Sequence, residues 1–114
     1  MGIRNISKDV LFVNLPEEPH LGDELENVNE IASNRRDCDV VIDFSEVEML
    51  TSASICNLMI LNKLLSGIGR QLILCNVSFP TKCIFTLTGL KSSFKFANDK
   101  LSALESIRNT SVSS

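Results

Sequence analysis

The sequence lacks residues on which several kinds of binding and catalytic site depend. It contains no tryptophan and no tyrosine, so we expect neither a sugar-stacking site nor an aromatic cage for quaternary ammonium groups. Its single histidine, His20, lies in a proline-rich turn, where a surface imidazole is a simpler interpretation than a Ser-His-acid catalyst. Its four cysteines show no Cys-x-x-Cys spacing, whereas a zinc site needs clustered cysteine and histidine ligands. We therefore expect no metal and no cofactor, and free thiols that behave as small hydrophobic side chains at Cys38, Cys56, Cys75 and Cys83.

The chain also lacks an excess of basic charge and a long apolar run. It has 14 acidic and 11 basic residues, a formal net charge of −3, and no basic stripe of the kind that neutralises phosphates. Nucleic acid is therefore not an expected partner. The first residues carry no apolar signal-peptide core, and no segment approaches the roughly 18 apolar residues of a membrane span. Together with the free thiols, these features predict a cytoplasmic protein without membrane insertion.

Apolar patterning predicts alternating strands and helices. Short β-branched and apolar runs predict strands at residues 10–15, 39–44, 71–76 and 94–96. Apolar spacings of three and four predict helices between them, and a last helix capped by Asn98 or Asp99. The residues expected to be buried in the last two helices are Cys83, Ile84 and Leu87, then Leu101, Leu104 and Ile107. The alternation is typical of an α/β domain with a largely parallel sheet.

The most informative stretch joins a buried-looking strand to a helix through a loop rich in hydroxyl groups. Its strand ends at Asp43, and hydroxyl side chains follow at Ser45, Thr51, Ser52 and Ser54. A carboxylate at the end of a buried strand can fix the following turn, and we favour that interpretation of Asp43 over a catalytic role. Thr51 and Ser52 fall where the helix begins, and there N–H groups are unpaired and favour oxygen or negative charge. Capping of the helix explains a hydroxyl at this place, and a modified hydroxyl is compatible with it.

Other signalling and cofactor-binding folds fit the sequence less well. A phosphorelay receiver domain would use an acidic pair such as Glu17-Glu18 and a phosphoacceptor such as Asp43. However, Asp43 follows the first predicted strand after only one helix, so the number of strands does not match. The sequence contains no phosphate-binding Gly-x-x-x-x-Gly-Lys-Ser/Thr loop, no Gly-x-Gly-x-x-Gly turn and no His-Glu-x-x-His motif.

Residues 40–55, VVIDFSEVEMLTSASI, resemble the signature of the STAS domain of bacterial anti-sigma factor antagonists. That signature is an apolar strand ending Asp-Leu/Phe-Ser, a Val-x-Phe/Met-apolar step, and Asp-Ser-Ser/Thr-Gly-Leu at a helix start. The resemblance continues at residues 69–77, 85–90, 94–96 and 102–104, and so covers roughly residues 10–107. It implies a single STAS-like α/β domain over residues 1–114, with its core at about 10–107 and a frayed tail at 109–114. Its sheet would be mixed but mostly parallel, with four to five strands flanked by about four helices.

The resemblance also implies a non-enzymatic switch in transcription regulation. Such a domain binds an anti-sigma factor that is also a Ser/Thr kinase, and phosphorylation by that kinase ends the binding until a phosphatase restores it. Ser52 matches the phosphoacceptor, and Thr51 is the alternative acceptor. Thr51 replaces the signature Asp, and Ser54 replaces the signature Gly. Residues 16–21 replace an early Gly-x-Leu/Asp segment of the family.

The expected contact with the partner is the strand–loop–helix at residues 46–57. The residues expected to bind the partner are Asp43, Glu46, Glu48, Met49, Thr51, Ser52, Ala53, Ser54, Ile55 and Asn57. Loss of the signature Asp and Gly leaves an alternative open, a STAS scaffold or adaptor that is never phosphorylated and belongs to a sensory or transport complex.

Overall fold

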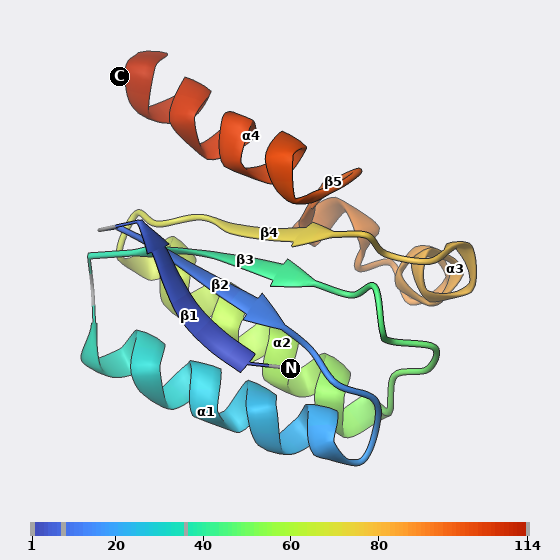
Figure 1. The fold of residues 1–114 in the computed structure, drawn as a ribbon. Coiled ribbons are helices and arrows are strands. Elements are labelled where there is room, and N and C mark those ends of the chain that lie inside the picture. Colours follow the sequence, from blue (N-terminus) through green and yellow to red (C-terminus); the bar gives the residue numbers. More distant parts are fainter. Residues whose placement is uncertain (1, 8, 36, 114) are drawn as a thin grey trace.

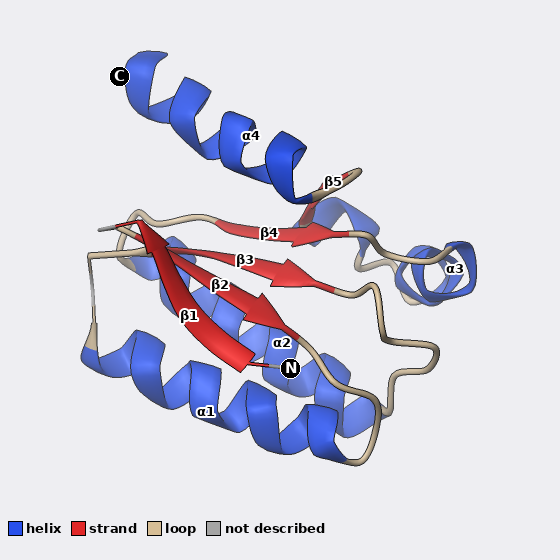
Figure 2. Cartoon of the chain, viewed as in Figure 1, coloured by secondary structure: helices blue, strands red, loops and turns tan. Residues whose placement is uncertain are grey.

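The computed structural model describes residues 2–7, 9–35 and 37–113 of the 114-residue chain. Strands and helices alternate after an initial pair of strands (Figures 1 and 2). The elements are β1 (Gly2–Ser7), β2 (Val10–Asn14), α1 (His20–Asn34), β3 (Asp39–Asp43), α2 (Ser52–Gly67), β4 (Leu72–Cys75), α3 (Phe79–Leu87), the short 3-10 helix η1 (Lys91–Ser93), β5 (Lys95–Ala97) and α4 (Lys100–Ser113). None of the described helices is both long and apolar enough to span a membrane.

The described strands form one mixed sheet of five strands in the order β1-β2-β3-β4-β5. β1 runs antiparallel to β2, and the other neighbours are parallel. The register places Asp43 at the end of β3 opposite Asn14 of β2 on one side and Cys75 of β4 on the other. The predicted α/β class and the mixed, mostly parallel sheet are therefore confirmed.

Helices cover both faces of the sheet, in three layers. Figure 1 shows α1 and α2 side by side on one face and α4 on the other, with α3 at one end of the sheet. Leu25 and Val28 of α1 and Leu58 and Leu61 of α2 are fully buried against the first face. On the second face, buried Ala103 and Ile107 of α4 meet Phe12, Val41 and Ile73. Since β3 is covered on both sides, its apolar run matches what parallel strands require.

The sequence did not predict β1, and Val10–Asn14 is the second strand rather than the first. The β1 segment GIRNIS mixes polar with apolar residues because it is an edge strand. The pairing of β1 with β2 also shifts register between Asn5 and Ser7. Such an irregularity breaks the period-two pattern by which a strand is recognised.

The predicted buried faces of the last two helices were partly wrong. Leu87 is 85% exposed and Leu101 is 70% exposed, whereas Thr81 and Phe85 are fully buried. Thr81 can lie inside because its hydroxyl pairs with that of Ser78 at 3.0 Å. The last helix is also longer than expected, because α4 is assigned through Ser113 and so includes residues 109–113 of the predicted tail, while Ser114 lies outside the described residues.

Candidate functional site

Polar side chains at or just after the carboxyl ends of three parallel strands meet around Asp43. The Asp43 carboxylate accepts hydrogen bonds from Asn14 Nδ2 at 2.8 Å and Asn76 Nδ2 at 3.0 Å. It also accepts from the Ser45 backbone N–H at 2.9 Å and the Ser45 hydroxyl at 3.1 Å. Both carboxylate oxygens are thus engaged within the chain, as expected for a residue that fixes the turn after its strand. Asp43 thereby supports the loop at residues 44–51.

Thr51 caps the N-terminus of α2. Its side-chain oxygen accepts from the Ser54 backbone N–H at 3.1 Å, and its hydroxyl donates to Ser54 Oγ at 3.1 Å. Threonine is a favoured N-cap because its oxygen satisfies one of the N–H groups that lack a partner within the helix. The capping role that the sequence predicted at this junction is therefore Thr51's.

Glu18, from the segment between β2 and α1, completes this cap. Its Oε2 atom accepts from the Thr51 backbone N–H at 3.0 Å and from Ser54 Oγ at 2.7 Å. In a local capping box, a Glu or Gln three residues into the helix reaches back to the N-cap N–H. Here the third helical residue is Ser54, too short for that role, and the carboxylate comes from 33 residues earlier in the sequence.

The hydrogen bonds at this cap also shift the pKa of the Glu18 carboxyl. Burial raises the pKa of the Glu18 carboxyl, because burial disfavours the charged form. The hydrogen bonds from the Ser54 hydroxyl and from Thr51 outweigh burial, so the pKa lies below its ordinary value. Glu18 therefore holds a negative charge at the start of α2.

Ser52 differs from the other three hydroxyl residues of this stretch. Ser45 donates to Asp43, Thr51 donates to Ser54, and Ser54 donates to Glu18. Ser54 is also only 1% exposed. Ser52, the first residue of α2, is exposed, and its hydroxyl forms no hydrogen bond with any residue that the structure describes. Of these four residues, Ser52 is therefore the one whose hydroxyl meets solvent without a hydrogen-bond partner among the described residues.

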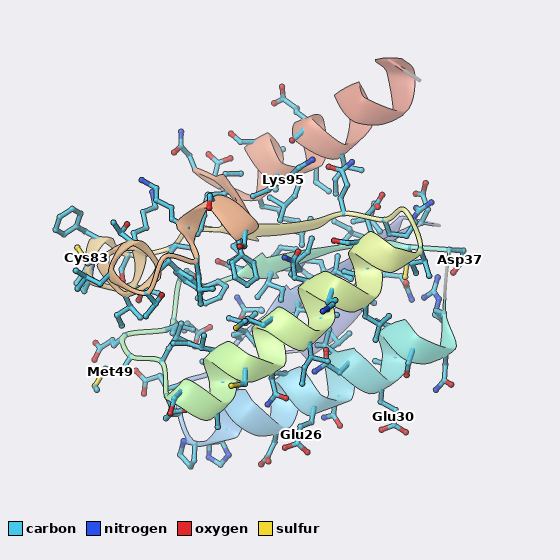
Figure 3. The ribbon with its side chains drawn as sticks, turned by 180° about the vertical axis from the view of Figure 1, so that it is seen from behind. Glu26, Glu30, Asp37, Met49, Cys83 and Lys95 are labelled. Carbon is cyan, nitrogen blue, oxygen red and sulfur yellow. The ribbon has the colours of Figure 1, made fainter. Side chains whose placement is uncertain are left out.

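The loop between β3 and α2 presents acidic and apolar side chains to solvent. Buried Val47 and Leu50 anchor it, while Glu46 and Glu48 are exposed and Met49 is 74% exposed. Figure 3 shows Met49 at the same end of the molecule as Cys83 of α3.

A hollow of about 170 Å³ lies between this loop and the segment after β2. It is lined by Glu17, Glu18, Glu48 and Met49. Neither Glu46 nor Glu48 forms a salt bridge with a described residue.

The structure separates the predicted contact residues into exposed and inward-facing groups. Glu46, Glu48, Met49, Thr51, Ser52 and Ala53 are exposed. Ser54 is buried, and Ile55 packs against the core. Asn57 faces α1, where its backbone carbonyl accepts from Asn29 Nδ2 at 3.3 Å.

Two features of this end of the molecule were missed from sequence. Glu18 was considered only as part of a receiver-type acidic pair, since no local pattern connects it to Thr51. Phe79, the first residue of α3, is 78% exposed, and nothing in its spacing marks it as a surface residue.

The described residues offer no evident place for a metal ion, because no three His, Cys, Asp or Glu side chains among them are suitably grouped. His20 is exposed at the first position of α1, and no hydrogen bond joins it to Ser52 in the described part of the chain.

Comparisons with solved structures show the same fold. A serine-to-glutamate variant of RsbS from Moorella thermoacetica superposes with a TM-score of 0.83 at 18% identity, covering 96% of each chain. An anti-sigma-factor antagonist (STAS) domain protein from Planctomyces limnophilus gives 0.80 at 19% identity, covering 93% of this chain and 97% of that one. The Bacillus cell fate determinant SpoIIAA in its phosphorylated form gives 0.71 at 14% identity, covering 93% and 97%.

Sequence comparison identifies the family directly. No curated protein matches the chain closely enough to count as a relative. The family model of the STAS domain matches residues 6–103, most of the chain. The chain belongs to the STAS domain family.

Proposed function

We propose that this chain is an anti-sigma factor antagonist-like regulator, with residues 1–114 acting as a single STAS domain. It binds an anti-sigma factor that has Ser/Thr kinase activity, and phosphorylation of Ser52 ends the binding. It acts in the cytoplasm by binding, not as an enzyme.

One observation carries this proposal: Ser52 is exposed and its hydroxyl has no hydrogen-bond partner in the described part of the chain, whereas the other hydroxyls of the stretch are held in hydrogen bonds. A kinase needs a hydroxyl that can enter its active site and give up its proton. Thr51, the alternative acceptor, uses its oxygen for the cap and its proton for Ser54. Phosphorylation of Thr51 would remove that hydroxyl proton and crowd the cap, so the geometry favours Ser52.

The exposed loop beside Ser52 supports a docking role. Met49 offers an apolar side chain that the domain itself does not bury, and Glu46 and Glu48 flank it with negative charge. Interfaces commonly combine an apolar anchor with a charged rim. A partner seated on Met49 would lie close to Ser52, since Val47 and Leu50 fix the loop on the core.

Phosphorylation can end such binding without unfolding the domain. A phosphoserine carries about −1.5 to −2 charges and three acceptor oxygens. The start of α2 tolerates an anion, because helix N-termini favour negative charge by about 0.3–1 kcal/mol. A partner packed flush against Ser52 would instead meet a bulky, hydrated anion and lose its contact.

The proposal is tested by incubating the chain with ATP and a kinase-type anti-sigma factor encoded in the same genome, followed by intact mass measurement and peptide mapping. We expect one added phosphate on Ser52 and none on Ser52→Ala. Ser66→Ala is the matched control, because Ser66 is an exposed serine near the other end of α2. Phosphate on Thr51, or none despite stable binding, would contradict the proposal.

The scaffold alternative rests on the two departures from the family signature. Thr51 and Ser54 replace the Asp and the Gly, and Ser54 is built into the buried side of the cap. A scaffold that binds through another face would keep its partner when Ser52 is changed to Asp. A phosphorylation switch would lose its partner on Ser52→Asp. The control Ser66→Asp, about 21 Å away along α2, would leave partner binding unchanged.

A further inference from the structure

Glu18 links two segments of the chain that are far apart in sequence. The segment between β2 and α1 is held by Leu15 and Leu21, both fully buried. Between these anchors, Glu18 reaches across to Thr51 and Ser54 at the start of α2. Among the described residues, Glu18 alone has a side chain that links the segment between β2 and α1 to residues 51–54 by hydrogen bonds.

A phosphoserine at position 52 would place a second anion at the same helix terminus. Glu18 Oε2 lies 3.0 Å from the backbone nitrogen of Thr51, the residue directly before Ser52. Like charges at one helix terminus repel each other, and water screens the partly buried Glu18 carboxylate less than it would a fully exposed one. The phosphate can use the free N–H groups at the first turn, whereas Glu18 competes for the same partial positive charge.

We infer that Glu18 is the positioning residue through which phosphorylation of Ser52 acts on the segment between β2 and α1. In the unmodified protein Glu18 holds this segment against the α2 cap. In the phosphorylated protein the new anion weakens both Glu18 hydrogen bonds, and the segment loses its side-chain attachment to α2. This inference rests on the proposed phosphorylation of Ser52.

The consequence reaches the docking face. Glu17 and Glu18 form one side of the 170 Å³ hollow, and Glu48 and Met49 form the other. When the Glu18 attachment weakens, the two sides are no longer held together at Thr51. Phosphorylation would therefore alter the surface around Met49 as well as obstructing the position of Ser52 itself.

A double-mutant cycle on the isolated chain tests this coupling without any partner. Phosphoserine is introduced at position 52 by genetic encoding, in the wild type and in Glu18→Gln. Glutamine keeps an acceptor oxygen and removes the charge. We expect phosphorylation to shift the Tm about 4 °C further downward in the wild type than in Glu18→Gln. Glu17→Gln, which removes an exposed charge one residue away, should respond like the wild type.

Equal Tm shifts in the wild type and in Glu18→Gln would overturn the inference, because a purely structural Glu18 gives additive effects. If Glu18→Gln does not fold, hydrogen exchange of the Thr51 amide decides. Faster exchange in the phosphorylated wild type supports the coupling, and unchanged exchange refutes it. Since no kinase or anti-sigma factor takes part, failure of the proposed function would be seen separately, as absent phosphorylation or partner binding that phosphate leaves intact.

Discussion

Two serines at the start of α2 should respond very differently to removal of their hydroxyls. Ser54 is 1% exposed, and its Oγ accepts from Thr51 and donates to the Glu18 carboxylate at 2.7 Å. A hydrogen bond to a charged group contributes about 1.5–3 kcal/mol to stability. Alanine leaves the volume nearly unchanged, so we expect Ser54→Ala to cost about 2 kcal/mol. Ser52 is exposed and makes no such bond in the described structure, so Ser52→Ala should stay within about 0.5 kcal/mol of the wild type.

Urea denaturation of the wild type and the two variants measures this difference directly. Comparable slopes in all three would show that only stability has changed, and the midpoints then give the free energies. The reasoning is refuted if Ser54→Ala is as stable as the wild type, or if Ser52→Ala loses more than about 1 kcal/mol. Either result would mean that the hydrogen bonds at this helix start are not distributed as described.

Three further predictions concern the carboxylates and thiols. Asp43→Ala leaves four donor groups without their acceptor, so we expect it to lower the free energy of unfolding, measured with denaturant, by about 2–3 kcal/mol. A decrease of less than about 0.5 kcal/mol would contradict the role of Asp43 in fixing the loop. Because the pKa of Glu18 lies below its ordinary value of 4.5, its contribution to stability is fully present above that pH and is lost as the pH falls through the lowered pKa. Between pH 7 and pH 3 the Tm of the wild type should therefore fall more steeply than that of Glu18→Gln, and parallel curves would refute this. Burial raises the pKa of the Cys75 thiol to about 12, so a thiol reagent at pH 8 should modify exposed Cys56 first and Cys75 only on unfolding; early labelling of Cys75 would contradict its burial.

The sequence predicted best where burial is simple. The apolar run ending at Asp43 is covered on both faces, and its β-branched residues predict such a buried strand. The helix after Thr51 follows from apolar spacing and from a hydroxyl at its start, and the cap forms as that pattern indicates. These local signals and the STAS signature were sufficient for the fold class.

Prediction failed where a residue's surroundings come from distant parts of the chain. β1 is an edge strand, and its polar residues obscure the apolar–polar alternation by which a strand is recognised from sequence. It is recognised in the structure by its pairing with β2. Apolar spacing predicts that Leu87 is buried, yet Leu87 is exposed and Phe85 is the buried residue of this helix. The Phe85 ring contacts the rings of Phe94 and Phe96 edge to face, with centroid distances of 5.3 and 5.5 Å. Glu18 reaches its partners across 33 residues, a relation that no local motif contains.

The most direct test of the proposed switch is the affinity of the kinase-type anti-sigma factor for the chain with and without phosphoserine at position 52, measured by isothermal titration. Placing an anion inside an interface that is otherwise well packed costs several kcal/mol, so we expect the Kd to rise by at least about 100-fold on phosphorylation. Equal affinities for the two forms would contradict the switch, and would mean that this STAS domain binds through a face that does not include Ser52.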